Sequence, residues 1–149
     1  MIDLAQKPEY LAWAARILCA HLDPKLCAWI TVRKDFNILG VVVYTNITRH
    51  NCDMAVASST PRFLSRRMLD VVFHYPFITL GLGRVSAIID ESNARSLSLC
   101  SRLGFVQEGT LRRWFGERSG IVMGLLRDDC KWIGVENEQK FSRISTRIA

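Results

Sequence analysis

The sequence has 149 residues, of which 49% are hydrophobic and 23% are charged. These values are typical of one compact globular domain and argue against a disordered or collagen-like chain. The longest apolar runs, residues 38–44 and 71–80, fall well short of the roughly 20 residues that a membrane-spanning helix needs. The net charge of +6 suits a polyanionic ligand, either a nucleic acid or the phosphates of a cofactor.

The cysteines and the N-terminus indicate a reducing compartment. No C-x-x-C pair occurs, and no histidine cluster lies near the cysteines, so we expect reduced thiols and no metal site. Residues 1–7 lack the basic start and apolar stretch of a secretory signal. Together these features predict a cytoplasmic protein.

The first part of the chain predicts a helix followed by three strands. Residues 8–21 carry apolar side chains at helical spacing, which predicts an amphipathic helix. Residues 27–33, 39–45 and 52–58 are rich in Val, Ile and aromatic side chains and are separated by short polar turns. This spacing predicts an antiparallel meander.

A second helix is predicted after the third strand. Thr60 and Pro61 have the pattern of an N-cap followed by proline at the first helical position. Apolar side chains then fall on one face as far as Pro76. Residues 84–90 predict a strand, and the crossover through this helix leaves room for parallel pairing with the third strand.

The last predicted elements are a helix over residues 93–103, which stops at Gly104, and a strand pair over residues 105–113 and 121–127. The order of elements predicts a mixed α/β fold in a single domain, residues 1–134. Residues 135–149 form a polar, basic tail that we expect to be loosely ordered.

The stretch from Asn93 to Gly109 resembles the GNAT N-acetyltransferases. It combines an N-x-x-S pattern at Asn93 and Ser96, a helix, Leu-Gly-Phe at residues 103–105 and an x-x-E-G pattern at residues 106–109. The similarity extends over about residues 8–127. Within the family, the sequence looks like the branch that acetylates protein N-termini. Tyr75-Pro76-Phe77 also looks like a feature of bacteriophage-encoded acetyltransferase-like proteins. A phage origin would imply that the protein acts in the host cytoplasm.

This resemblance implies the GNAT fold, a mostly antiparallel twisted sheet with one splayed parallel strand pair and helices on both faces. It also implies acetyl-CoA as co-substrate, with its pantetheine arm in the gap between the splayed strands. Val56 and Ala57 would supply the strand edge, and the backbone N–H of one or the other would be the oxyanion donor. Asn93 and Ser96 would bind the arm from the far side. The pyrophosphate would lie on backbone N–H groups at the start of the following helix.

The phosphate turn departs from the family pattern. The usual R/Q-x-x-G-x-G/A is replaced by Val-Ala-Ser-Ser-Thr-Pro over residues 56–61, so both small-residue positions differ. We expect the hydroxyls of Ser58, Ser59 and Thr60 and the guanidinium of Arg62 to replace some of the phosphate contacts. Arg66 and Arg67 are further candidates, with a solvated helix face as the alternative.

Acetyl transfer to an amine needs a base for the ammonium proton and an acid for the departing thiolate. The carboxylates nearest the predicted gap are Asp53 and Glu108, and His50 is a third candidate base. Cys100 stands where many relatives carry a tyrosine that acts as the acid. For Asp53 and Glu108 the alternative is a surface role, and for Cys100 it is a place in the core.

The acceptor is expected to be a primary amine of a protein or a small molecule. Two alternatives stay open. One is a non-catalytic GNAT-shaped module that binds nucleic acid or a host protein through its basic surface, and the other is acylation of a nucleobase. Trp114 and Phe115 either line an acceptor pocket, pack on the fold or form the contact of a homodimer.

Overall fold

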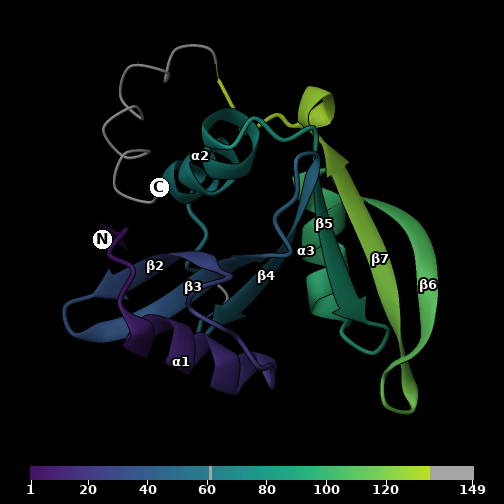
Figure 1. Cartoon of the computed structure of the whole chain (residues 1–149), viewed down its shortest axis with the longest axis horizontal. Coiled ribbons are helices and arrows are strands. Elements are labelled where there is room, and N and C mark those ends of the chain that lie inside the picture. The colour runs from purple at the N-terminus through teal and green to yellow at the C-terminus, as the bar shows by residue number, and fades with distance from the viewer. Residues whose placement is uncertain (61, 135–149) are drawn as a thin grey trace.

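The computed structural model describes residues 1–60 and 62–134 and contains a seven-stranded sheet with helices packed against it (Figure 1). The strand order is β1-β2-β3-β4-β5-β7-β6. Every neighbouring pair is antiparallel except β4 with β5, which is parallel. The predicted mixed α/β class and its single parallel pair are therefore confirmed.

The elements follow one another along the chain in nearly the predicted order. They are β1 (Ile2–Asp3), α1 (Pro8–Leu18), β2 (Ala28–Lys34), β3 (Asn37–Thr45), β4 (Asn51–Ser58), α2 (Arg66–His74), the π-helix η1 (Tyr75–Thr79), β5 (Arg84–Asp90), α3 (Ala94–Leu103), β6 (Val106–Phe115), β7 (Arg118–Leu126) and the 3-10 helix η2 (Arg127–Asp129). None of the helices in the described ranges is both long and apolar enough to cross a membrane.

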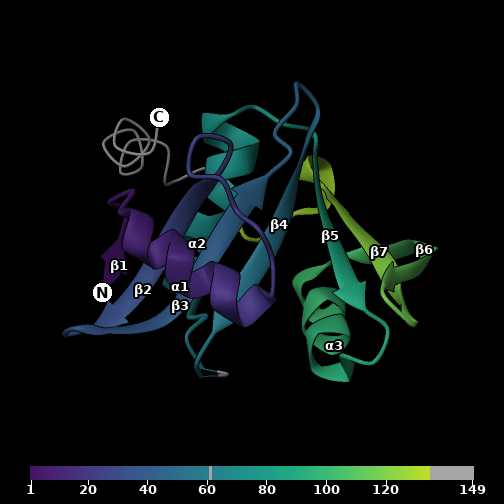
Figure 2. The same ribbon diagram turned by 60° about the horizontal axis from the view of Figure 1, so that its bottom comes forward.

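Helices cover both faces of the half of the sheet formed by β2, β3 and β4. Figure 2 shows α1 in front of these strands and α2 behind them. Tyr10, Leu11 and Ala14 of α1 form one core cluster with alternate side chains of the strands, including Ala57. The intervening side chains, such as Val56, contribute to a larger cluster with α2, η1 and α3. Because strand side chains alternate between faces, neighbouring residues of β4 belong to different cores.

The parallel strands β4 and β5 pair only at their first residues. The facing pairs are Asn51 with Arg84, Cys52 with Val85 and Asp53 with Ser86. Beyond these pairs the two strands diverge (Figure 2), whereas β4 stays paired with β3 as far as Ser58. Among residues 1–60 and 62–134, no strand covers the other backbone edge of the second half of β4.

The second helix begins later than the sequence predicts. The predicted N-cap was Thr60, but α2 starts at Arg66 and its N-cap is Ser65, whose Oγ accepts a hydrogen bond from the Met68 N–H at 3.2 Å. Phe63 is 7% exposed, and its ring lies against Gly40 of β3, where an added Cβ would be 2.5 Å from the ring. We infer that burial of this aromatic side chain outweighs the local capping signal. Pro61 lies outside the described residues.

The same helix continues past Pro76, where the sequence predicts that it ends. Residues 75–79 form η1, and the Leu80 N–H donates to the Tyr75 carbonyl at 3.0 Å, a π-type bond. Pro76 has no N–H to bond the Val72 carbonyl, and that carbonyl instead accepts a hydrogen bond from the Tyr44 hydroxyl at 2.7 Å. Tyr75 and Phe77 are buried, so packing supports the extra turn.

Candidate active site

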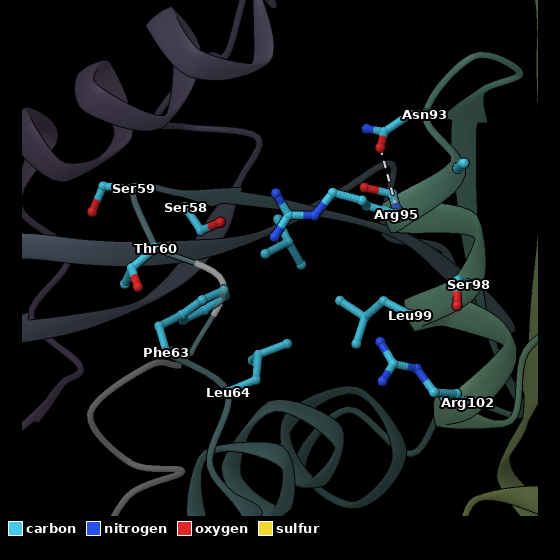
Figure 3. Close-up of a pocket in the computed structure, with 13 residues that line it drawn as sticks. Ser58, Ser59, Thr60, Phe63, Leu64, Asn93, Arg95, Ser98, Leu99 and Arg102 are labelled. Carbon is cyan, nitrogen blue, oxygen red and sulfur yellow. Dashed lines mark hydrogen bonds between the residues drawn. The ribbon is translucent and has the colours of Figure 1, made fainter.

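A cleft of about 600 Å³ lies where β4 and β5 diverge (Figure 3). One wall comes from the end of β4 and the segment that follows it, and the other comes from α3. The first wall consists of Val56, Ser58, Ser59, Thr60, Phe63 and Leu64, and the second of Asn93, Ala94, Arg95, Ser96, Ser98, Leu99 and Arg102. The structure thus brings together most of the residues predicted to hold a cofactor, with Ala57 and Arg62 as the exceptions.

The register of β3 and β4 decides which backbone groups face the cleft. The Ser59 N–H donates to the Leu39 carbonyl at 3.0 Å, and the facing pairs continue as Val41 with Ala57 and Val42 with Val56. Hydrogen-bonded and non-hydrogen-bonded pairs alternate in an antiparallel ladder. The Ala57 backbone therefore bonds to β3, and the Val56 backbone points away from β3 towards the cleft.

This register corrects the prediction for Ala57. Its side chain is fully buried in the core under α1, and its N–H is directed to β3. Ala57 is therefore not available as a donor to a ligand between β4 and β5. Val56, by contrast, lines the cleft.

The turn after β4 does not form the predicted helix N-terminus. The Ser59 hydroxyl lies 3.2 Å from the backbone carbonyl oxygens of both Ile38 and Leu39 and donates its hydrogen bond to them. This hydroxyl is therefore already bound to β3. Ser58 and Thr60 remain on the cleft wall, and Figure 3 shows them opposite α3. Arg62 is exposed and does not line the cleft.

The α3 wall is positioned by local interactions at both ends of the helix. The Asn93 Oδ1 accepts a hydrogen bond from the Ser96 N–H at 3.1 Å, which makes Asn93 the N-cap. Gly104 ends the helix with a φ of 106°, a left-handed conformation that favours glycine. The N-x-x-S pattern thus has a structural role in α3 in addition to its predicted contact with a cofactor.

The cleft carries positive charge, and no carboxylate of the described part of the chain lines it. Arg95 and Arg102 extend from α3 into it (Figure 3). Sequence reasoning missed these two arginines together with Ala94, Ser98 and Leu99. Helical spacing is the signal that points to four of them, because residues 95, 98, 99 and 102 recur at i, i+3, i+4 and i+7 and share one face.

Asp53 lies outside the cleft, at the start of β4 where that strand still pairs with β5. Its Oδ2 accepts a hydrogen bond from Asn46 Nδ2 at 2.8 Å. The role of Asp53 as base stays a prediction.

Glu108 is bound to Arg84 rather than directed into the cleft. Arg84 Nη1 donates to Glu108 Oε1 at 3.0 Å, and Nη2 contacts Oε2. The hydrogen bond from Arg84 holds the pKa of the Glu108 carboxyl below its ordinary value. A carboxylate with a lowered pKa is a weaker base, so this geometry favours the predicted surface role of Glu108 over the catalytic one.

Cys100 faces the core, where it packs against the large hydrophobic cluster, and it is absent from the residues that line the cleft. Burial raises the pKa of its thiol to about 11. The packing agrees with the core alternative for this residue.

The remaining candidates also lie away from the cleft. His50 is exposed in the turn between β3 and β4. Trp114 and Phe115, 56% and 38% exposed, lie near the end of β6 at the edge of the sheet. Over the residues that the structure describes, His, Cys, Asp and Glu side chains form no cluster that could hold a metal ion.

Comparison with known proteins gives structural neighbours only. No protein-family model and no curated protein matches the sequence. Among solved structures, a mutant form of the spermidine/spermine N-acetyltransferase SpeG from Vibrio cholerae has a TM-score of 0.62 at 19% identity, with 69% of this chain and 68% of that chain covered. The ribosomal-protein-S5-alanine acetyltransferase from Vibrio fischeri also has a TM-score of 0.62, at 24% identity, with 72% and 65% covered. The chain has the GNAT fold.

A third structure with this fold contains acetyl coenzyme A. The N-acetyltransferase PseH from Campylobacter jejuni, in complex with acetyl coenzyme A, has a TM-score of 0.54 at 19% identity, with 68% of each chain covered. At these identities the likeness concerns architecture, and function has to be argued from the site.

Proposed function

We propose that the chain is an N-acetyltransferase that transfers the acetyl group of acetyl-CoA to a primary amine. The observation that carries this proposal is the cleft between the diverging strands β4 and β5, with the uncovered backbone edge of β4 along one wall. An extended chain of amides, such as a pantetheine arm, can pair with such an edge as an added strand does.

The residues of the cleft fit this ligand. The Val56 N–H and carbonyl are directed to the cleft by the register of β3 and β4. Asn93 and Ser96 lie on the opposite wall with polar side chains. The two arginines on that wall suit the phosphates of the nucleotide portion.

In the proposed reaction the amine nitrogen attacks the thioester carbonyl carbon, the carbon–sulfur bond breaks and the sulfur leaves as a thiolate that takes up a proton. In this proposal the Val56 N–H, which does not bond to β3, donates to the carbonyl oxygen as negative charge develops on it. Water is the proposed carrier of the proton, because Asp53 and Glu108 lie outside the cleft and Cys100 packs against the core.

We further propose a protein α-amine as the acceptor. An α-amine has a pKa of about 8 and a lysine side chain one of about 10, so the α-amine needs less help from a base at neutral pH. The carboxylates considered as bases are already partnered, Asp53 by Asn46 and Glu108 by Arg84. A site with so little basic assistance favours the acceptor that loses its proton more readily. Similarity to the N-terminal branch of the family supports the same choice.

The test combines binding with the Val56→Pro variant. Calorimetry is expected to show that the wild-type protein binds acetyl-CoA. A separate assay of free thiol is expected to show that coenzyme A is released when a peptide with an unblocked N-terminus is added. Val56→Pro removes one N–H that β3 does not use, so the protein should remain folded while turnover falls at least about tenfold. Val56→Ala is the matched control and should keep the activity.

No binding of acetyl-CoA at millimolar concentration would refute the proposed function and favour a non-catalytic module. Equal rates with a peptide whose only free amine is a lysine would refute the α-amine preference alone. Retention of full activity in Val56→Pro would refute the assignment of the oxyanion donor.

A further inference from the structure

We infer that Arg95 and Arg102 of α3 form the phosphate-binding site for coenzyme A in this chain. The inference rests on the proposed binding of acetyl-CoA and concerns where its phosphates are held. It assigns to α3 a role that the sequence predicts for the turn after β4.

The predicted turn lacks the features of an anion site. No glycine occurs between residues 57 and 65, so the backbone cannot approach a phosphate as closely as in a glycine-rich turn. The helix that should direct its N–H groups at the ligand begins only at Arg66, and the side chain of its own N-cap, Ser65, occupies one of these donors. The Ser59 hydroxyl is engaged on β3.

The arginines of α2 do not replace this turn. Arg62, which precedes the helix, and Arg67 are exposed and lie outside the cleft lining. Arg66 forms an ion pair with Asp70 at 3.7 Å, and its guanidinium lies 5.1 Å from the ring centroid of Trp132. Each of the three therefore lacks access to the cleft or has another partner.

Arg95 and Arg102, in contrast, converge on the cleft. Figure 3 shows both side chains pointing from α3 towards the opposite wall. They are seven positions apart, which is about two turns and about 10 Å along the helix axis, so they can contact different phosphates of one ligand. Across the described residues neither forms an ion pair, and no carboxylate lines the cleft. Their charge is thus uncompensated within the site.

The place of Arg95 in the helix is a second, independent observation. It is the second residue of α3, in a first turn that contains no acidic residue. A positive charge at this end interacts unfavourably with the helix dipole. A residue that opposes the local preference and points into a cleft is typical of a binding site rather than of a solvated helix face.

The test compares acetyl-CoA with acetyl-pantetheine, which lacks the nucleotide and all of its phosphates. Calorimetry would measure both ligands on the wild type, Arg95→Gln, Arg102→Gln and the double variant, with Arg67→Gln as an exposed arginine outside the cleft for control. We expect each single variant to bind acetyl-CoA about tenfold more weakly and the double variant about a hundredfold more weakly. Affinity for acetyl-pantetheine should stay unchanged in every variant, and the salt dependence of acetyl-CoA binding should decrease.

The outcomes separate this inference from the proposed function. If the wild type binds acetyl-CoA and the double variant binds it equally well, the phosphate site is not on α3, although the proposed function stands. A loss that is equal for the two ligands would show a general disturbance of the cleft and would also overturn the inference. If the wild type does not bind acetyl-CoA, the proposed function itself fails. Thermal unfolding of the free variants checks folding, and Arg95→Gln should be at least as stable as the wild type.

Discussion

Replacement of Gly40 by alanine tests how the wall of the cleft is built. Gly40 lies in β3 between β2 and β4, and an added Cβ there would be 2.5, 2.7 and 2.9 Å from three carbons of the Phe63 ring. Real Cβ atoms do not approach other atoms so closely, so the ring would have to move. Phe63 is buried and lines the cleft, and its displacement should therefore affect both stability and ligand binding.

The expected cost follows from the two opposing effects. Overpacking of a core side chain costs about 1–3 kcal/mol. Alanine also restricts the unfolded chain relative to glycine and returns about 0.4–1 kcal/mol. The net loss is about 1–2 kcal/mol, which corresponds to a decrease in Tm of about 3–8 °C for a chain of this size. Thermal and urea unfolding followed by circular dichroism would measure it.

A double-mutant cycle with Phe63→Leu shows whether the contact is the cause. The smaller side chain should make room for the new methyl group, so Gly40→Ala should cost less in the Phe63→Leu background by at least about 0.5 kcal/mol. Gly109→Ala is the matched control, because it also lies in a strand but has nothing within 4 Å of the added Cβ. An equal cost of Gly40→Ala in both backgrounds would refute the reasoning.

Three further predictions concern the sites that the sequence singled out. Asn93→Ala should lower stability by about 1 kcal/mol through loss of the N-cap, whereas Asn93→Asp should keep the cap and weaken acetyl-CoA binding; a loss of stability in both would contradict this. Alkylation of Cys100 at neutral pH should be about 100-fold slower in the native than in the unfolded protein. The reason is that its pKa rises from 9.0 to about 11, which lowers the thiolate fraction by about the same factor. Equal rates would show that the thiol is accessible. Glu108→Gln should leave turnover intact but remove the contribution of the Arg84 pair to stability. That contribution is fully present above pH 4.5, the ordinary pKa of the group, and it is lost as the pH falls through the lower folded-state pKa. An unchanged pH–stability profile would show that the pair contributes nothing.

Local sequence signals located most of the elements. The meander of β2, β3 and β4 follows from β-branched runs between short turns, and α3 follows from Asn93 at one end and Gly104 at the other. Errors arose where distant residues meet. The start of α2 was misplaced because the contact between Phe63 and Gly40 joins positions far apart in the chain, and β1 was missed because a two-residue strand carries no periodic pattern.

The candidate site divides in the same way. The residue types that line the cleft, including Val56, Ser58, Asn93 and Ser96, could be named from the motif and from the order of strands. Their accessibility could not, because backbone direction in β4 depends on its register with β3. That register places the Val56 N–H towards the cleft and commits Ala57 to the neighbouring strand.

The sequence by itself determined the GNAT-like order of elements and the ends of α3, since these depend on interactions between residues a few positions apart. Only the tertiary structure decided which charged groups meet a ligand. Glu108 is paired with Arg84, whereas Arg95 and Arg102 point into the cleft. The physical reason is that a side chain's partners are set by elements packed around it, and those elements come from distant parts of the chain.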